Sequence, residues 1–135
     1  MLIETQMALR WRDLDAYNHV NNSVFLTFIE EARIKWFGSL AGPWRDDSSE
    51  PVVARTEVNY RMPIKYPATL KIRLLAGRIG NASLTIAHEI DDLDTGARYS
   101  DGNTVLVWVS PASGTPVSLP SMIRQAAERA HAGGS

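Results

Sequence analysis

The sequence has no cysteine, no long hydrophobic run and almost no net charge, and each of these absences excludes a class of protein. Without cysteine there is no disulfide, no thiolate nucleophile and no cysteine-based zinc site, a composition that fits a reducing compartment. No segment approaches the roughly 20 consecutive apolar residues of a membrane-spanning helix, and the N-terminus lacks the apolar core of a signal peptide. We therefore expect a soluble cytoplasmic protein that does not enter a membrane.

The charged residues nearly balance, with 14 Lys and Arg against 15 Asp and Glu. Such a chain has no broad basic field for nucleic acid or anionic lipid, so its ligand is expected to be recognised by local contacts. The length of 135 residues, 44% of them hydrophobic, is enough for one compact core. The sequence predicts one domain over residues 1–135, with no nucleic-acid partner, no metal site and no cofactor.

Alternating hydrophobic and polar residues at the N-terminus predict a half-buried strand. Its buried face is expected to carry Ile3, Thr5, Met7, Leu9 and Trp11. From Val24 to Trp36 apolar residues recur at three- and four-residue steps, which predicts an amphipathic helix. This helix is expected to begin within 21–23, where each residue is a good N-cap, and to end near Gly38 or Gly42.

After a surface loop at 44–50, the pattern changes to strands. In "PVVARTEVNYR" the residues expected on one face are Val52, Ala54, Thr56, Val58 and Tyr60. Two more strands flank a turn at Gly80, a further strand covers "NTVLVWVS", and their short turns favour antiparallel pairing. A short helix is expected after Pro120, followed by a frayed Gly-Gly-Ser end. This order of elements predicts an α+β fold in which one sheet covers the long helix.

The segment "RWRDLDAYNHVNNSVFLTFIEEAR", residues 10–33, combines D-x-D-x-x-x-H-V-N-N with an aromatic-rich helix that ends in E-E-A-R. It resembles the N-terminal motif of hotdog-fold acyl-CoA thioesterases of the 4-hydroxybenzoyl-CoA thioesterase-like family. "GRIGNASLTIAHEI" is similar to that family's Gly-x-x-Ser strand opening, and the order of elements agrees along nearly the whole chain. The resemblance implies a curved antiparallel sheet wrapped around one long central helix, and hydrolysis of an acyl-CoA or acyl-ACP thioester.

The resemblance also implies roles for residues of the motif. The second aspartate, Asp15, is expected to act as general base, or as nucleophile through a mixed anhydride. Backbone N–H groups near Asn22 and Ser23 are expected to polarise the thioester carbonyl, because a helix N-terminus offers unpaired donors and a positive dipole end. His19 either orients Asp15 or a water, or simply bonds the backbone. The Asn22 side chain is compatible with helix capping and with a functional role.

Other polar residues of the motif region are interpreted as structural. Asp13 is expected in a turn or in solvent, and His88 is expected to pack in the core. Glu30 is interpreted as part of a charged helix face rather than as the helix carboxylate of another hotdog branch. Asn18 stands where many relatives have glycine, and the turn is expected to survive because asparagine tolerates a positive φ.

Coenzyme A carries a 3′-phosphate and a pyrophosphate, which need cations or helix ends at the mouth of a groove. The candidate cations are Arg61, Lys65, Arg73 and Arg78. Of these, Arg61 and Arg78, together with Ser23, are the predicted substrate-binding residues. Unpaired sheet edges need to be covered, and protomers of the resembled family join edge to edge, so we expect a homodimer or homotetramer.

Two other functions are compatible with a hotdog domain. One is a non-catalytic module that binds an acyl thioester, but a sensor of this kind ordinarily needs an output element, and one hotdog domain fills the 135 residues. The other is a dehydratase or hydratase, which needs its own Asp-and-His signature on a different loop, and the sequence lacks it. The sequence therefore favours the thioesterase.

Overall fold

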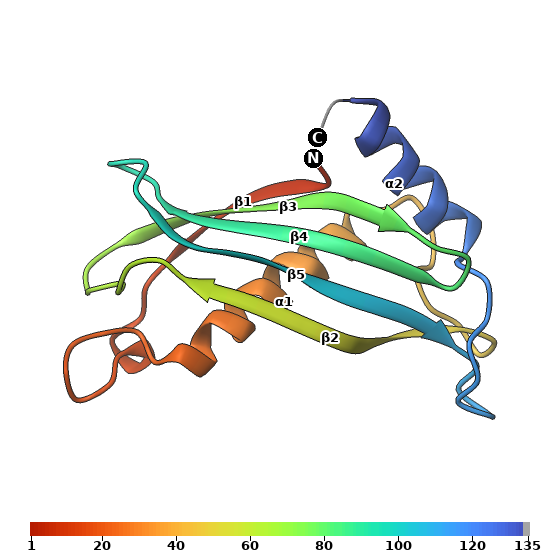
Figure 1. Ribbon diagram of the computed structural model, residues 1–135, viewed down its shortest axis with the longest axis horizontal. Helices are drawn as coiled ribbons and strands as arrows, with labels where there is room; N and C mark the ends of the chain where they lie inside the picture. The colour runs from red at the N-terminus through yellow and green to blue at the C-terminus, as the bar shows by residue number, and fades with distance from the viewer. Residues whose placement is uncertain (134–135) are drawn as a thin grey trace.

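The computed structural model describes residues 1–133, in which five strands form one antiparallel sheet and two α-helices pack against it (Figure 1). The elements are β1 (Ile3–Ala8), the 3-10 helix η1 (Trp11–Asp13), α1 (Asn22–Gly38), β2 (Glu50–Tyr60), β3 (Thr69–Ile79), β4 (Ser83–Asp92), β5 (Arg98–Val109) and α2 (Ser121–Ala132). The strand order β1-β3-β4-β5-β2 leaves β1 and β2 at the two edges. With α1 lying along one face of the sheet, the predicted α+β hotdog fold is confirmed.

The core lies between α1 and the sheet. Alternate residues of the central strands are fully buried on the face toward α1, among them Ile72 and Leu74 of β3 and Leu84 of β4. α1 contributes Phe25, Phe28, Ile29, Ala32, Trp36 and Phe37, which confirms its predicted apolar face. Burial of each large apolar side chain stabilises the fold by about 1.5 to 3 kcal/mol.

α1 begins and ends where the sequence predicts. Asn21 is the N-cap, and its Oδ1 accepts a hydrogen bond from the Ser23 N–H at 2.9 Å. The helix ends at Gly38, the first of the two predicted ends, and the N–H of Ser39 caps the last turn. Asn18 has a φ of 60°, so this asparagine adopts the left-handed backbone that was expected of it.

Two predicted strand faces are confirmed for most of their residues and wrong at one end. β1 ends at Ala8, and Trp11 lies in η1 with 73% of its surface exposed, because the chain turns at this point to form the loop before α1. In β2 the register shifts between Val53 and Arg55, so a β-bulge reverses the alternation. As a result Val53, rather than Val52, shares the side toward α1 with Thr56.

The C-terminal helix predicted after Pro120 is confirmed as α2, which buries four residues of its own against the core. Its Arg124 donates a hydrogen bond to the Gly80 carbonyl at the β3–β4 turn. The frayed end was predicted for the Gly-Gly-Ser segment, residues 133–135. Residues 134 and 135 lie outside the described residues. Within residues 1–133, no helix has the length and apolar character needed to cross a membrane.

His88 on β4 is the one histidine that the described part of the core buries. Its side chain is 1% exposed, and Nε2 lies 3.2 Å from the Ser100 hydroxyl oxygen. Nδ1 has no hydrogen-bond partner within residues 1–133. Burial lowers the pKa of His88 to about 4, since the charged imidazolium is disfavoured in the core. The prediction that His88 packs in the core is confirmed.

This burial predicts a loss of stability in acid. The unfolded chain takes up a proton at His88 near pH 6.5, whereas the folded chain does so only near pH 4. Stability is therefore retained above about pH 6.5 and falls between pH 6.5 and 4, by on the order of 3 kcal/mol. Urea unfolding of wild type and His88→Gln across this range measures the effect. The variant should lose less stability on acidification, and an unchanged pH dependence would contradict the assignment.

Candidate active site

The loop between β1 and α1 carries two aspartates in different environments. Asp13 is 3% exposed, and its carboxylate binds the Arg10 guanidinium at 3.0 Å and the Arg10 backbone N–H at 2.9 Å. The Asp13 carbonyl accepts a hydrogen bond from the Asn21 N–H. Asp13 is thus part of a turn, as predicted, but the expectation of a solvated carboxylate is wrong because Arg10 covers it.

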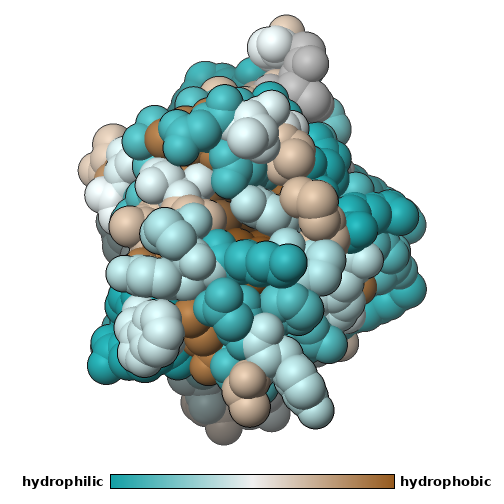
Figure 2. All heavy atoms as spheres, turned by 90° about the vertical axis from the view of Figure 1, so that its left-hand side faces the viewer, coloured by the Kyte–Doolittle hydropathy of each residue, from teal (hydrophilic) through white to brown (hydrophobic). Residues whose placement is uncertain are grey.

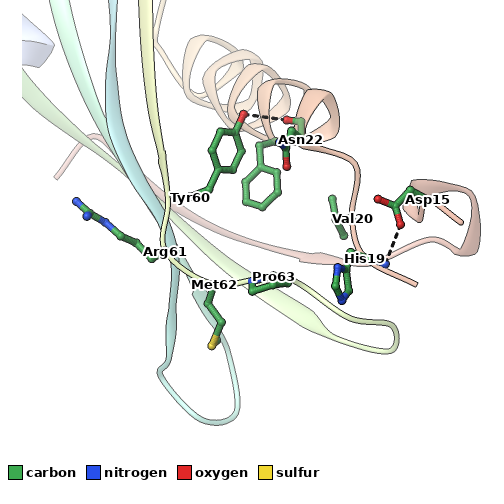
Figure 3. A pocket seen from close by; sticks show the side chains of 9 residues that line it. Asp15, His19, Val20, Asn22, Tyr60, Arg61, Met62 and Pro63 are labelled. Atoms are coloured by element: carbon green, nitrogen blue, oxygen red, sulfur yellow. Dashed lines mark hydrogen bonds between the residues drawn. The ribbon is translucent and has the colours of Figure 1, made fainter. Parts of the chain in front are cut away.

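Asp15 is exposed, and its two carboxylate oxygens differ in the hydrogen bonds that they accept. Oδ1 accepts hydrogen bonds from the Tyr17 N–H at 2.8 Å and the His19 N–H at 3.2 Å, which close the loop. Oδ2 accepts no hydrogen bond within residues 1–133, and the carboxylate faces the start of α1 in Figure 3. One oxygen therefore fixes the carboxylate, and the other remains available to a ligand.

His19 contacts Asp15 through its backbone rather than its ring. Besides the N–H bond to Oδ1, the His19 carbonyl accepts the Asp15 N–H at 2.7 Å. The imidazole points away from the carboxylate and makes no hydrogen bond within the described residues, and His19 lines the pocket together with Met62 and Pro63 (Figure 3). In this structure His19 orients Asp15 by main-chain contacts, and its ring forms part of a pocket wall.

The first turn of α1 offers one free donor at this site. The N–H and hydroxyl of Ser23 both bind Asn21 Oδ1, at 2.9 and 2.8 Å, so Ser23 serves the helix cap and does not line the pocket. The Asn22 N–H donates no hydrogen bond within the part of the chain that the structure describes. The Asn22 carbonyl accepts the Tyr60 hydroxyl at 3.2 Å. Of the two predicted backbone donors, only that of Asn22 is free.

A pocket of about 240 Å³ brings the predicted catalytic residues together. Its lining consists of Asp15, His19, Val20, Asn22, Phe25, Tyr60, Arg61, Met62 and Pro63. Figure 2 faces the end of the molecule that carries the Asp15 loop, and hydrophobic residues are visible there in hollows between hydrophilic ones. Within residues 1–133, no three acidic or histidine side chains gather as metal ligands.

Tyr60 lines the pocket, a role that the sequence did not predict, since it indicated only that Tyr60 belongs to a strand face. Its ring packs edge to face on Phe25, with the ring centroids 4.9 Å apart, and its hydroxyl reaches the Asn22 carbonyl. An aromatic residue at the end of β2 was the only sequence signal for this role. Tyr60 links the edge strand β2 to the first turn of α1.

The two predicted arginines lie in different places. Arg61 lines the pocket, but its guanidinium pairs with Asp101 at 2.9 Å, and this hydrogen-bonded contact lowers the pKa of Asp101. Arg78 lies near the far end of β3, roughly 30 Å along the strand from Thr69 beside the loop. Within one protomer the structure does not bring Arg78 to this pocket.

Comparison with known proteins identifies the family. A family model described as the thioesterase-like superfamily matches residues 9–127. The chain belongs to the thioesterase-like superfamily. The predicted family and the predicted thioesterase class of enzyme are thereby confirmed.

The chain is similar to proteins of this family from several bacteria. It is 36% identical to the PA2801 protein from Pseudomonas aeruginosa, with a TM-score of 0.86 over 93% of this chain and 97% of that one. A thioesterase from Thermus thermophilus, solved with coenzyme A and Zn, is 33% identical, with a TM-score of 0.83 over 97% and 95%. The long-chain acyl-CoA thioesterase FadM of Escherichia coli is 28% identical over 131 residues, which cover 94% of this chain and 98% of FadM.

The buried Asp13 predicts a measurable structural role. Asp13→Asn keeps the side-chain shape but removes the charge that holds Arg10, so the free energy of unfolding should fall by about 1 to 2 kcal/mol. Urea unfolding measures this loss. Asp94→Asn, in the exposed β4–β5 turn, is the matched control and should change stability by less than about 0.5 kcal/mol. Equal stability of the two variants would contradict a structural role for Asp13.

Proposed function

We propose that the chain hydrolyses an acyl-CoA thioester to a free acid and coenzyme A, with Asp15 acting on the acyl carbon and the Asn22 N–H polarising the carbonyl. The observation that carries this proposal is that one pocket is lined by both Asp15, which has an unbonded carboxylate oxygen, and Asn22, which has an unbonded N–H. A carboxylate supplies the base or nucleophile, and an N–H at a helix start stabilises the developing oxyanion.

Two chemical routes use the same two groups. As general base, Asp15 Oδ2 takes a proton from water while the water oxygen bonds to the acyl carbon. As nucleophile, Oδ2 bonds to that carbon itself, the C–S bond breaks to leave a mixed anhydride, and water then hydrolyses the anhydride. In both routes negative charge passes to the carbonyl oxygen, where the Asn22 N–H donates to it. In both routes this first intermediate collapses with cleavage of the C–S bond, and the leaving thiolate takes up a proton.

The pocket wall suits an apolar acyl group. Val20, Phe25, Tyr60 and Met62 supply aliphatic and aromatic surface beside the two polar groups. Coenzyme A is the favoured carrier, since FadM is named as an acyl-CoA thioesterase and the Thermus thermophilus thioesterase was solved with coenzyme A. Acyl-ACP remains the alternative carrier.

The remaining predicted residues take narrower roles in this proposal. His19 forms part of the pocket wall, and Arg61 can reach a phosphate only by exchanging its contact with Asp101. A non-catalytic binding module is disfavoured because it would have no use for a fixed carboxylate with one free oxygen at the pocket. The cytoplasmic location stays a prediction.

We also propose that the chain forms a homodimer or homotetramer. β2 is an 11-residue edge strand whose outer side pairs with no strand of the described chain. A long exposed edge of this kind is usually covered, because its free N–H and C=O groups otherwise promote aggregation.

The catalytic assignment predicts opposite behaviour for the two loop aspartates. Asp15→Asn should lower kcat by about 10²-fold or more, since it removes the base or nucleophile, and should leave KM nearly unchanged. Asp13→Asn should change activity by less than about tenfold, because Asp13 acts only on loop stability. Thiol release from acyl-CoAs of several lengths measures kcat and KM, with circular dichroism as the control for folding. An active Asp15 variant beside an inactive Asp13 variant would overturn the assignment.

A further inference from the structure

A second cavity follows the candidate active-site pocket along α1 and β2. The pocket itself is lined by Asn22 and Phe25 of α1 and by Tyr60 of β2. Both elements run away from the Asp15 loop, α1 from its first residue and β2 toward its own start (Figure 1). Further along them lies a groove of about 190 Å³, which we name the Thr104 groove. Its lining consists of Leu26, Ile29, Glu30, Arg33, Val53, Thr56 and Thr104.

The separation of the Thr104 groove from the pocket follows from the geometry of the two elements. Ile29 follows Asn22 by seven residues, which is roughly 10 Å along a helix. Thr56 precedes Tyr60 by four residues, which is roughly 13 Å along a strand. An extended chain advances about 1.2 Å per bond, so an acyl chain whose carbonyl lies at the Asn22 N–H reaches the groove at about its ninth to twelfth carbon.

The Thr104 groove contains a buried hydroxyl without a partner. Thr104 is 2% exposed, and its Oγ1 makes no hydrogen bond within residues 1–133. In the sheet it is paired with Thr56 of β2, so two threonines lie opposite each other on the side toward α1. A hydroxyl that is buried without a hydrogen bond is unfavourable, because folding removes it from water and returns nothing. A ligand group that bonds Thr104 Oγ1 would recover this loss.

His88 brings a second unpartnered polar atom to the same face of the sheet. It is paired with Gly102, two residues before Thr104 on β5, so His88 and Thr104 are diagonal neighbours. A Cβ at Gly102 would lie 2.8 Å from His88 Cε1, so the imidazole extends over β5 at this glycine. Its Nδ1 has no hydrogen-bond partner in the described chain. A neutral imidazole offers one donor and one acceptor nitrogen.

The lining of the Thr104 groove indicates the chemistry of its ligand. Leu26, Ile29 and Val53 supply the apolar surface that a hydrocarbon chain needs. A ligand hydroxyl both donates and accepts, so it matches Thr104 and also His88 in either tautomer. A terminal methyl group would leave Thr104 unpaired. Glu30 and Arg33 also line the groove, and their opposite charges favour neither a carboxylate nor an amine.

We infer that the acyl group of the substrate carries a hydroxyl in its distal part, at about the ninth to twelfth carbon, and that Thr104 Oγ1 binds this hydroxyl in the groove between α1 and β2. This inference names the substrate class of the hydrolysis proposed above and rests on that proposal. The reacting end of the chain lies at Asp15 and Asn22, and its hydroxyl-bearing end lies at Thr104. Thr104 thereby selects among acyl groups without contacting the thioester.

Three substrates of equal chain length test this inference. The hydroxyl of 10-hydroxydecanoyl-CoA reaches the Thr104 groove, that of 3-hydroxydecanoyl-CoA stays near the thioester, and decanoyl-CoA has none. Wild type should hydrolyse the first with kcat/KM about tenfold or more above the other two, since only the first pairs the buried hydroxyl. Thiol release measures kcat/KM.

Two variants of Thr104 assign the preference to its hydroxyl. Thr104→Val keeps the shape and removes the hydroxyl, so the ratio of kcat/KM for 10-hydroxydecanoyl-CoA to that for decanoyl-CoA should fall to within about twofold of one. Thr104→Ser keeps the hydroxyl and should keep most of the preference. Thr85→Val is the matched control, because Thr85 lies on the other face of β4 from the buried Leu84 and Ile86, and it should leave the ratio unchanged. Circular dichroism is the folding control.

The outcomes separate this inference from the proposed function. Equal kcat/KM of wild type for 10-hydroxydecanoyl-CoA and decanoyl-CoA would overturn the inference and leave the hydrolysis intact. A preference that Thr104→Val does not reduce, or a preference for 3-hydroxydecanoyl-CoA, would also overturn the inference alone. Failure of wild type to hydrolyse acyl-CoAs of any length would overturn the proposed function, and the inference with it.

Discussion

The backbone N–H groups in the first turn of α1 have no carbonyl acceptor within the helix. The candidate site depends on which of these N–H groups the preceding loop binds and which it leaves free. Asn21 Oδ1 accepts hydrogen bonds from the N–H and the hydroxyl of Ser23. The Asp13 carbonyl accepts a hydrogen bond from the N–H of Asn21. The Asn22 N–H is left free, and Asn22 lines the same pocket as Asp15. A residue with a free donor and a residue with a free carboxylate oxygen thus line one pocket, while the neighbouring polar groups are bonded elsewhere.

The sheet and the core fix the positions of the Asp15 loop and of the first turn of α1. The Val20 N–H donates to the Ile64 carbonyl, which ties the end of the loop to the segment between β2 and β3. Phe25 anchors the first turn of α1 in the core, and Tyr60 packs on it from β2. A site built on a buried helix and a paired strand holds its groups more precisely than a free loop would. The position of Asp15 relative to α1 therefore depends on the same packing that stabilises the domain.

The sequence predicted the elements that have a clear hydrophobic period and the residues that belong to a local motif. α1, the three strands β3 to β5 and α2 follow from spacing and turn residues, and the meeting of Asp15 with Asn22 follows from the motif. Contacts between specific polar partners were not predictable in this way. The burial of Asp13 depends on the Arg10 side chain folding over it, and the pairing of Arg61 with Asp101 joins residues 40 positions apart. The β-bulge between Val53 and Arg55 was likewise not predictable, because no Gly or Pro stands at the positions where the register shifts.

The central claim is that the thioester carbonyl binds between Asp15 and the start of α1. The most direct measurement is a crystal structure of the protein with a non-hydrolysable acyl-CoA analogue in which a methylene group separates the sulfur from the carbonyl. We expect the analogue's carbonyl oxygen within about 3.2 Å of the Asn22 nitrogen, and its carbonyl carbon facing Asp15 Oδ2. An analogue bound with its carbonyl away from both groups would contradict the account.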